Sequence, residues 1–195
     1  MYKLCKTEQS AKRQREIEDC LLDIMRIKNF DDITITELCE RMKMPRKAFY
    51  RYFDSKEDTL VALIDHHLSE YGGFSIDRSN DANRMLANEL EEYFIFWKQK
   101  RDILSVLDRS GLLGTLTQRI INYPLQDRIL IARFLPDDKD NARDMIFKFA
   151  LSGLMNTMIC WYRDDFNIPT RDMAEMACRM LREPLFPNLE KLGIQ

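Results

Sequence analysis

Hydrophobic residues recur three and four positions apart along most of the chain, which is the spacing of one face of an α-helix. The first clear case is the set Ile17, Cys20, Leu21 and Ile24. Glycine and proline are scarce, at six each, and no proline lies between Pro45 and Pro124. Few turn formers favour long uninterrupted helices, so the pattern predicts an all-α fold.

Two short helices are predicted between residues 34 and 53. Thr34 and Glu37 match the capping box, in which the threonine hydroxyl accepts the backbone N–H of Glu37 and the glutamate reaches back. Pro45 suits the first position of the second short helix, which we expect to run from Arg46 to Phe53. Ser55 and Asp58 indicate another capped start, and the helix after it buries Leu60, Val61, Ile64 and Leu68.

A glycine pair and a polar run interrupt the helical pattern at residues 71–81, so we place a domain boundary there. One domain is expected over residues 10–70 and a second over residues 74–195. In the second part, helices are predicted at Asp81 to Lys100, Asp102 to Arg109, Leu112 to Leu135 with a break or kink at Pro124, Asp138 to Asp164, and Thr170 to Leu185.

Composition excludes several classes of protein. Hydrophobic residues make up 45% and charged residues 32%, which is typical of a globular chain. The longest apolar runs are too short for a membrane span, and the N-terminus lacks the apolar stretch of a signal peptide, so we expect a cytoplasmic protein. The five cysteines form no CxxC pair and are interpreted as reduced thiols, although their number alone leaves redox sensing through Cys5, Cys20 or Cys178 open.

No constellation of catalytic residues stands out. His66 and His67 are the only histidines, and adjacent positions on a helix point about 100° apart, so they do not form a metal pair. Neither a phosphate-binding glycine loop nor an HExxH motif occurs. We therefore expect no enzyme activity, no metal and no cofactor.

Charge is concentrated in one window of a chain whose net charge is only −2. From Arg41 to Lys56 six basic residues face a single acidic one, Asp54, which gives this window a net charge of +5. Cationic side chains that neutralise DNA phosphates release counterions and gain affinity. Two short helices with such a window favour a DNA-binding helix-turn-helix, although a solvated helix face explains most charge runs.

The residue pattern closely resembles the DNA-binding domain of TetR/AcrR-family transcriptional regulators. Two stretches carry the resemblance, Thr34-Ile35-Thr36-Glu37-Leu38-Cys39-Glu40-Arg41-Met42 and Pro45 to Glu57, with Phe49-Tyr50-Arg51-Tyr52-Phe53 as the most specific part. It covers residues from about 10 to 70. The second half looks like a C-terminal domain common in Firmicutes members, through Phe94 to Arg101, Ser152-Gly153-Leu154 with Trp161, and Thr170 to Leu181.

The resemblance implies a role for eight residues in DNA binding. Arg46 and Lys47 would point into the major groove, where arginine is well shaped for the O6 and N7 of guanine. The remaining contacts would be to the phosphate backbone, including a clamp by Lys56 at the start of the following helix. The full set is Thr34, Thr36, Arg46, Lys47, Tyr50, Arg51, Tyr52 and Lys56.

Three positions depart from the family pattern. Lys43 stands where glycine is usual in the turn, and a left-handed lysine costs roughly 1–2 kcal/mol. Pro45 and Lys47 replace small or hydroxyl residues, so a phosphate contact through a serine hydroxyl is lost. These changes bear on how bases are read and leave the expected fold unchanged.

The second half predicts a dimer and a ligand pocket. The segment from Met145 to Tyr162 is apolar on nearly every side, which indicates burial all round and so a second subunit as cover. We expect the interface at Phe149, Gly153, Met176, Ala177 and Met180. Aromatic residues at Phe94, Trp97, Tyr123, Phe147 and Trp161 are candidates for an effector pocket, with ordinary core packing as the alternative.

These inferences combine into one functional hypothesis. The chain is expected to act as a homodimeric repressor that binds double-stranded DNA at a near-palindromic operator and is released by a small-molecule effector. The alternative is a protein-interaction adaptor or co-activator that keeps a TetR-like fold and has little affinity for DNA. A co-regulator of that kind has no need of a +5 window, which favours the first hypothesis.

Overall fold

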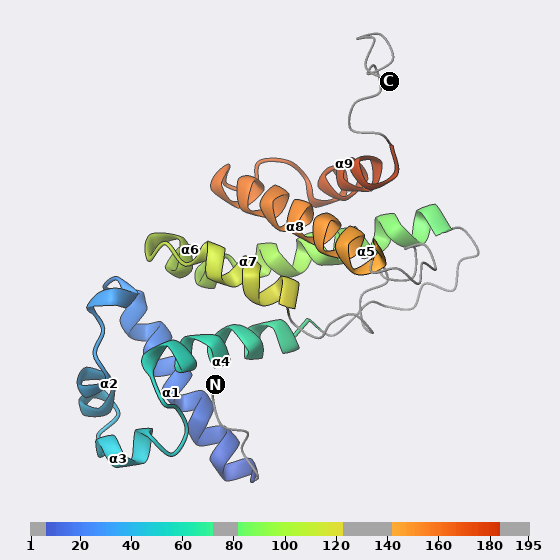
Figure 1. The fold of residues 1–195 in the computed structure, drawn as a ribbon. Helices are drawn as coiled ribbons and strands as arrows, with labels where there is room; N and C mark the ends of the chain where they lie inside the picture. The colour runs from blue at the N-terminus through green and yellow to red at the C-terminus, as the bar shows by residue number, and fades with distance from the viewer. Residues whose placement is uncertain (1–6, 72–81, 123–141, 184–195) are drawn as a thin grey trace. The chain divides into compact units, whose positions relative to one another are not determined.

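The computed structural model describes residues 7–71, 82–122 and 142–183, and every regular element in these ranges is helical (Figure 1). The predicted all-α fold is therefore confirmed. The elements are α1 (Glu8–Met25), the 3-10 turn η1 (Phe30–Asp32), α2 (Ile35–Arg41), α3 (Arg46–Phe49), α4 (Lys56–Ser69), α5 (Ala82–Gln99), α6 (Arg101–Arg109), α7 (Leu113–Asn122), α8 (Ala142–Arg163) and α9 (Thr170–Arg182).

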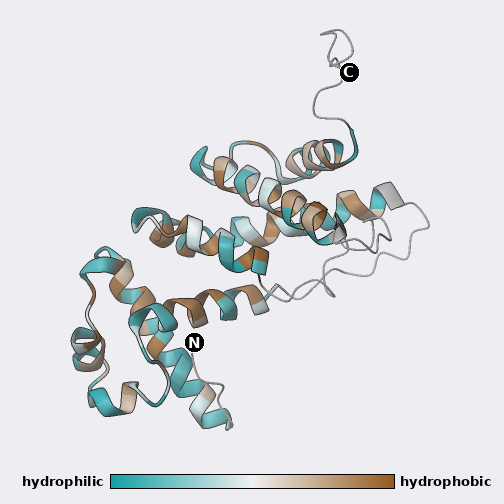
Figure 2. Cartoon of the chain, in the orientation of Figure 1, coloured by the Kyte–Doolittle hydropathy of each residue, from teal (hydrophilic) through white to brown (hydrophobic). Residues whose placement is uncertain are grey.

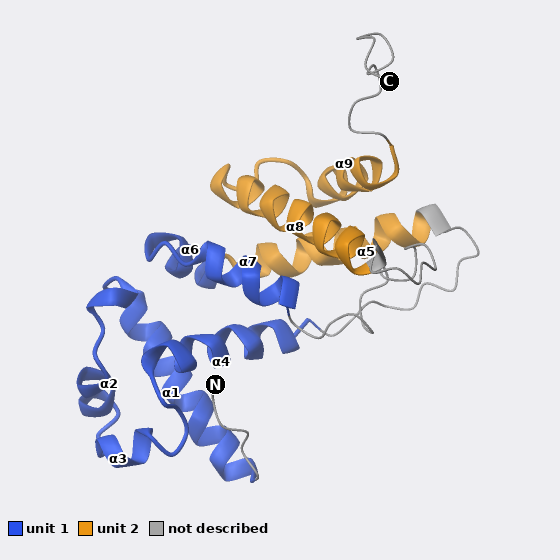
Figure 3. Ribbon diagram, viewed as in Figure 1, with its two compact units in different colours: residues 1–72, 102–122 blue, residues 73–101, 123–195 orange. Residues whose placement is uncertain are grey.

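The chain divides into two compact units (Figure 3). The N-terminal unit contains residues 1–72 and 102–122, and the C-terminal unit contains residues 73–101 and 123–195. The sequence placed residues 102–122 in the second domain, whereas the structure places them in the first unit. Contacts between residues far apart in sequence explain this difference, since Asp102 pairs with Arg26 and Arg119 pairs with Asp65.

Three helices form the centre of the N-terminal unit. α1 packs against α4, and α4 packs against α7. Helical spacing places Ile17, Leu21 and Ile24 of α1 in the core, as predicted, while the first turns of α1 are hydrophilic (Figure 2). The buried Asp65 of α4 accepts two hydrogen bonds from the Arg119 guanidinium of α7, a fork that satisfies both carboxylate oxygens.

Three helices within residues 7–71, 82–122 and 142–183 end in the same left-handed closure. After α2 the N–H of Met44 donates to the Cys39 carbonyl and the N–H of Lys43 donates to the Glu40 carbonyl, which is a Schellman motif. Its left-handed position is occupied by Lys43, with a φ of 51°. Gly111 holds the equivalent position after α6 and Asp165 after α8, with φ values of 70° and 56°.

Replacing Lys43 by glycine is expected to stabilise the protein by about 0.5–1 kcal/mol. A left-handed lysine costs roughly 1–2 kcal/mol, and the greater freedom of glycine in the unfolded chain offsets part of the gain. Urea denaturation of Lys43→Gly against the parent protein measures the difference. A glycine variant that is less stable than the parent would contradict this explanation of the turn.

Local sequence patterns predicted most of the helix starts correctly. Thr34 and Ser55 both cap a helix, since their hydroxyl oxygens accept the N–H of Glu37 and Asp58. The second half of the predicted capping box is not formed, because the Glu37 carboxylate pairs with Lys28 at 2.5 Å. Pro45 is the N-cap residue of α3 and so precedes the first helical position expected for it.

The second short helix is shorter than predicted. α3 ends at Phe49 and the chain continues to Tyr52 as turns, in which the N–H groups of Arg51 and Tyr52 donate to carbonyls three residues earlier. Phe49 and Phe53 still point into the core and are completely buried. The turns after α3 therefore bury Phe53 together with Phe49, as the apolar spacing predicted, although the helix itself ends at Phe49.

The C-terminal unit is organised around α5. α9 packs along α5, and α8 also contacts it. The predicted helices there are confirmed as α5, α8 and α9. The start of α9 at Thr170 is the predicted one, and the other described ends fall one to four residues inside the expected ones. Residues 123–141 and 184–195 lie outside the described part. None of the helices in the described ranges is long and apolar enough to span a membrane.

Candidate nucleic-acid interface

α2, the turn at Met42–Pro45 and α3 form a helix-turn-helix in which one side of α3 is buried and the other is open to solvent. Leu38 of α2 and Phe49 of α3 have no exposed surface, so these apolar side chains fix the two helices against the core. The exposed side of α3 and the turn after it present Arg46, Lys47, Tyr50 and Arg51. Sequence reasoning assigned these four residues to DNA contacts, and the structure brings them onto one surface.

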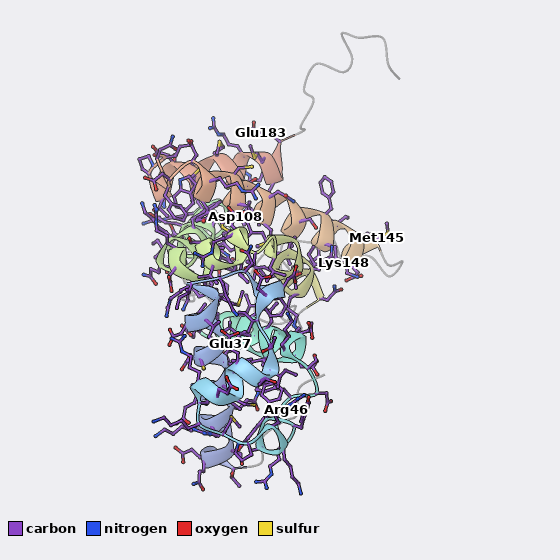
Figure 4. The ribbon with its side chains drawn as sticks, turned by 90° about the vertical axis from the view of Figure 1, so that its left-hand side faces the viewer. Glu37, Arg46, Asp108, Met145, Lys148 and Glu183 are labelled. Atoms are coloured by element: carbon purple, nitrogen blue, oxygen red, sulfur yellow. The ribbon has the colours of Figure 1, made fainter. Side chains whose placement is uncertain are left out.

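Arg46 and Tyr50 lie one helical turn apart and contact each other. The Arg46 Nη2 donates a hydrogen bond to the Tyr50 hydroxyl oxygen at 3.2 Å, and the Arg46 Cζ lies 6.0 Å from the Tyr50 ring centroid. Figure 4 labels Arg46 at the beginning of α3. The contact holds a fully charged guanidinium at the surface, where its planar fork suits the edge of a base or a phosphate.

The other assigned residues surround this face. Thr34 and Thr36 are exposed at the start of α2, and the N-cap role of Thr34 places its hydroxyl at the positive end of that helix. Tyr52 is half-buried in the turn after α3. All three lie in the N-terminal unit together with Arg46.

Lys56 differs from the other predicted phosphate contacts. Its ammonium donates hydrogen bonds to the backbone carbonyls of Phe30, Asp31 and Ile33 at 2.9, 3.0 and 3.1 Å. The same nitrogen lies 4.6 Å from the Phe30 ring centroid. The side chain is half-buried and directed at the turn that precedes α2.

Sequence reasoning missed a basic stretch on the first turns of α1. Gln9, Ser10, Lys12, Arg13 and Glu16 line a groove together with Tyr52, so the structure brings α1 beside the turn that follows α3. The run Lys12-Arg13-Gln14-Arg15 was the available signal. Its proximity to Tyr52 depends on tertiary packing, which the run itself does not reveal.

The cysteines of the described residues are free thiols, namely Cys20, Cys39, Cys160 and Cys178, and Cys5 lies outside that part. Burial raises the pKa of the Cys20 and Cys39 thiols, and the positive charge of Arg46 opposes this effect at Cys39. A raised pKa leaves less thiolate at neutral pH and so slows oxidation. This weakens the hypothesis of redox sensing at Cys20.

The aromatic residues assigned to an effector pocket are buried in the C-terminal unit. Phe94, Trp97, Phe147 and Trp161 are each less than 5% exposed, and Tyr123 lies outside the described residues. Phe94 and Trp161 meet edge to face with 5.4 Å between ring centroids. The Trp161 indole N–H donates to the Ile168 carbonyl at 3.0 Å, which satisfies its polar group.

The residues predicted for a dimer interface separate into two groups. Phe149 is 72% exposed, Met180 is 48% exposed and Gly153 is also open to solvent, so all three are available to a second subunit. Met176 is half-buried. Ala177 is only 1% exposed, on the face of α9 that is buried within its own unit.

Apolar side chains beside Phe149 extend the exposed face. Met145, labelled in Figure 4, is 70% exposed, and Ile146 is 42% exposed; both lie on the first turns of α8. Met145, Phe149 and Gly153 are four residues apart, which aligns them along one side of the helix. Together these side chains form an exposed apolar stripe on the first turns of α8.

The described part of the chain matches solved structures of transcription regulators along most of its length. The TetR-family transcriptional regulator from Streptomyces coelicolor aligns with a TM-score of 0.57 at 18% identity, over 88% of this chain and 79% of that one. The fold is TetR-like. The dihydroxyacetone kinase operon activator DhaS aligns with a TM-score of 0.53 at 14% identity, over 93% of this chain and 96% of that one.

A third similar structure is the fatty acid degradation regulator FadR from Bacillus halodurans. It aligns with a TM-score of 0.55 at 13% identity, over 93% of this chain and 98% of that chain. No family model and no curated protein matches the sequence. At these identities the similarity establishes the TetR-like fold.

Proposed function

We propose that this chain is a homodimeric transcription regulator that binds a specific DNA sequence and acts as a repressor. The observation that carries the proposal is the exposed cationic surface of α3 and the turn after it, which presents Arg46, Lys47 and Arg51 in a chain of net charge −2. Positive charge concentrated on an exposed helix increases affinity for DNA, because cations that neutralise phosphates release counterions. The three similar structures are of transcription regulators, which supports the same class of function.

The proposed interface separates base reading from backbone contact. Arg46 and Lys47 begin α3 and would enter the major groove, where a recognition helix uses its first residues to read bases. Thr34, Thr36, Tyr50, Arg51 and Tyr52 would contact phosphates and set the register. Lys12 and Arg13 extend the positive surface from Tyr52 onto α1 and would add backbone contacts.

The proposed dimer uses the exposed stripe of α8 together with Met180 of α9. A two-fold axis would place the same patch of each subunit against its copy and present two α3 helices to successive turns of DNA. The operator would therefore be near-palindromic. A small-molecule effector that enters the aromatic cluster of the C-terminal unit would favour a conformation that does not fit DNA and so release it.

Two substitutions test the division between reading and anchoring. Arg46→Ala is expected to relax the preference at one base position of each half-site, with a loss of about 1–3 kcal/mol on the preferred base. Tyr50→Phe is expected to weaken binding to all sequences equally. Binding assays on the upstream region with single-base operator variants measure both effects. If the two variants change the base preferences alike, the division is wrong.

A further inference from the structure

The backbone that leads into α2 is a short connection whose position decides where α2 lies. It runs from the end of α1 through η1 to Ile33, and Thr34 then caps α2. Phe30 and Ile33 are buried, so this connection is part of the N-terminal core. Any shift of its backbone moves Thr34 and Thr36, the two α2 residues assigned to phosphate contacts.

Lys56 holds this connection through all of its donors. An ammonium has three N–H donors and cannot accept a hydrogen bond. Three carbonyl oxygens lie within 3.1 Å of the Lys56 Nζ. Hydrogen bonds of this kind, between a charged donor and a carbonyl, are stronger than those between neutral groups. The carbonyls belong to Phe30, Asp31 and Ile33, directly before the N-cap of α2.

The three carbonyls also stabilise the positive charge of Lys56 at the N-terminus of α4. Lys56 is the first residue of α4, and the N-terminus of a helix repels a cation. Three carbonyl dipoles and the face of the Phe30 ring at 4.6 Å compensate for that repulsion. A phosphate oxygen could take a donor from Lys56 only by displacing one of these carbonyls.

We propose that Lys56 is a positioning residue that sets the entry of α2 into the DNA interface and does not itself contact phosphate. The expected effect on DNA affinity rests on the proposed DNA-binding function, and the placement of the connection before α2 rests on the three carbonyl contacts. α6 supports the same connection from another side, since the Phe30 N–H donates to the Ser110 hydroxyl at 3.2 Å and the Arg109 guanidinium donates to the Met25 carbonyl. Phe30 is thus tied through both its N–H and its carbonyl.

A salt titration of DNA binding distinguishes a positioning role from a phosphate contact. We would compare the parent protein with Lys56→Met, Lys56→Arg and Arg51→Ala, using fluorescence anisotropy on the upstream duplex at a temperature where all four are folded. The dimer carries each residue twice, so removing one phosphate contact per subunit reduces the slope of log K against log [salt] by about 1.8, twice the change of about 0.9 for a single contact. Arg51→Ala, the comparison for a backbone contact, should show that change.

Lys56→Met should instead lower the affinity for DNA by about tenfold at every salt concentration and leave the slope of log K against log [salt] as in the parent protein. The reason is that the hydrogen bonds lost are those of the Lys56 ammonium to backbone carbonyls within the protein, and no phosphate contact is lost. Lys56→Arg should fail to restore binding, since a planar guanidinium does not reproduce an ammonium among three carbonyls. Both expectations separate positioning from a purely structural role, which would lower the unfolding temperature and leave the affinity of the folded protein unchanged.

Amide hydrogen exchange on the free protein tests the contact without DNA. Exchange at residues 30–38 should accelerate in Lys56→Met and stay at the parent rate in Arg51→Ala; if the methionine variant does not fold, Lys56→Gln takes its place. A slope reduced by about 1.8 in Lys56→Met, full binding by Lys56→Arg, or unchanged exchange would overturn the proposal. If the parent protein itself binds no DNA, the proposed function fails, and the exchange measurement still decides whether Lys56 holds the connection.

Discussion

Phe149→Glu is expected to convert the dimer into monomers and to reduce affinity for a two-half-site operator by roughly 10²–10⁴-fold, because the second half-site then no longer benefits from linkage. Phe149 is 72% exposed on α8, and burying a phenylalanine contributes about 1.5–3 kcal/mol in each subunit. A two-fold interface brings the same patch of both subunits together, so each new carboxylate would be buried in the interface close to its copy. Analytical ultracentrifugation and operator binding measure the two effects.

Ile27→Glu is the matched control for this substitution. Ile27 is 73% exposed, so Ile27→Glu replaces an exposed apolar residue by glutamate just as Phe149→Glu does. It belongs to the N-terminal unit and lies outside the proposed interface. The control should remain dimeric. A Phe149→Glu protein that sediments as a dimer and binds the operator with parent affinity would show that this face of α8 does not form the interface.

Asp65→Ala is expected to lower the free energy of unfolding by about 1–3 kcal/mol, because it removes two charge-assisted hydrogen bonds from the Arg119 guanidinium, whose side chain is 33% exposed and so keeps part of its hydration. The Asp65 side chain is only 4% exposed, and its two oxygens accept from Nε and Nη2 of Arg119. The pair joins α4 to α7, so the loss weakens the packing of residues 102–122 on the N-terminal unit. Urea denaturation measures the change.

The chain offers a control of the same chemistry at the surface. Arg26 and Asp102 form an ion pair in the same unit with side chains that are 45% and 62% exposed. Exposed pairs contribute about 0–1 kcal/mol, so Asp102→Ala should have a small effect. The double variant Asp65→Ala/Arg119→Met should recover part of the loss. Equal losses from Asp65→Ala and Asp102→Ala would contradict the assigned role of the buried pair.

Features that depend on neighbouring residues were predictable from the sequence. The caps at Thr34 and Ser55 are formed by hydroxyls acting three residues along the chain, and the structure shows both. The left-handed turn residue Lys43 was expected from its place in the motif and has a φ of 51°. The burial of Phe49 follows from helical spacing. Each of these features is decided within about one helical turn.

Features that depend on tertiary contacts were not predictable. The assignment of α6 and α7 to the N-terminal unit rests on contacts such as Arg119 with Asp65, 54 positions apart. The three carbonyls that surround Lys56 lie 23 to 26 positions before it, so a basic residue in a DNA-binding motif gave no indication of them. Ala177 shares an apolar helix with exposed residues, and only the packing of α9 on α5 shows which side it occupies.

The cationic side of α3 is proposed to bind duplex DNA in the dimer, and a salt titration of the parent protein on its own upstream region measures this binding. In dilute buffer without added ligand, the account predicts saturable binding of one dimer per near-palindromic site. The logarithm of the binding constant should then fall linearly with the logarithm of the salt concentration. No binding to any upstream fragment in dilute buffer would contradict the account and would favour a protein-interaction adaptor with the same fold.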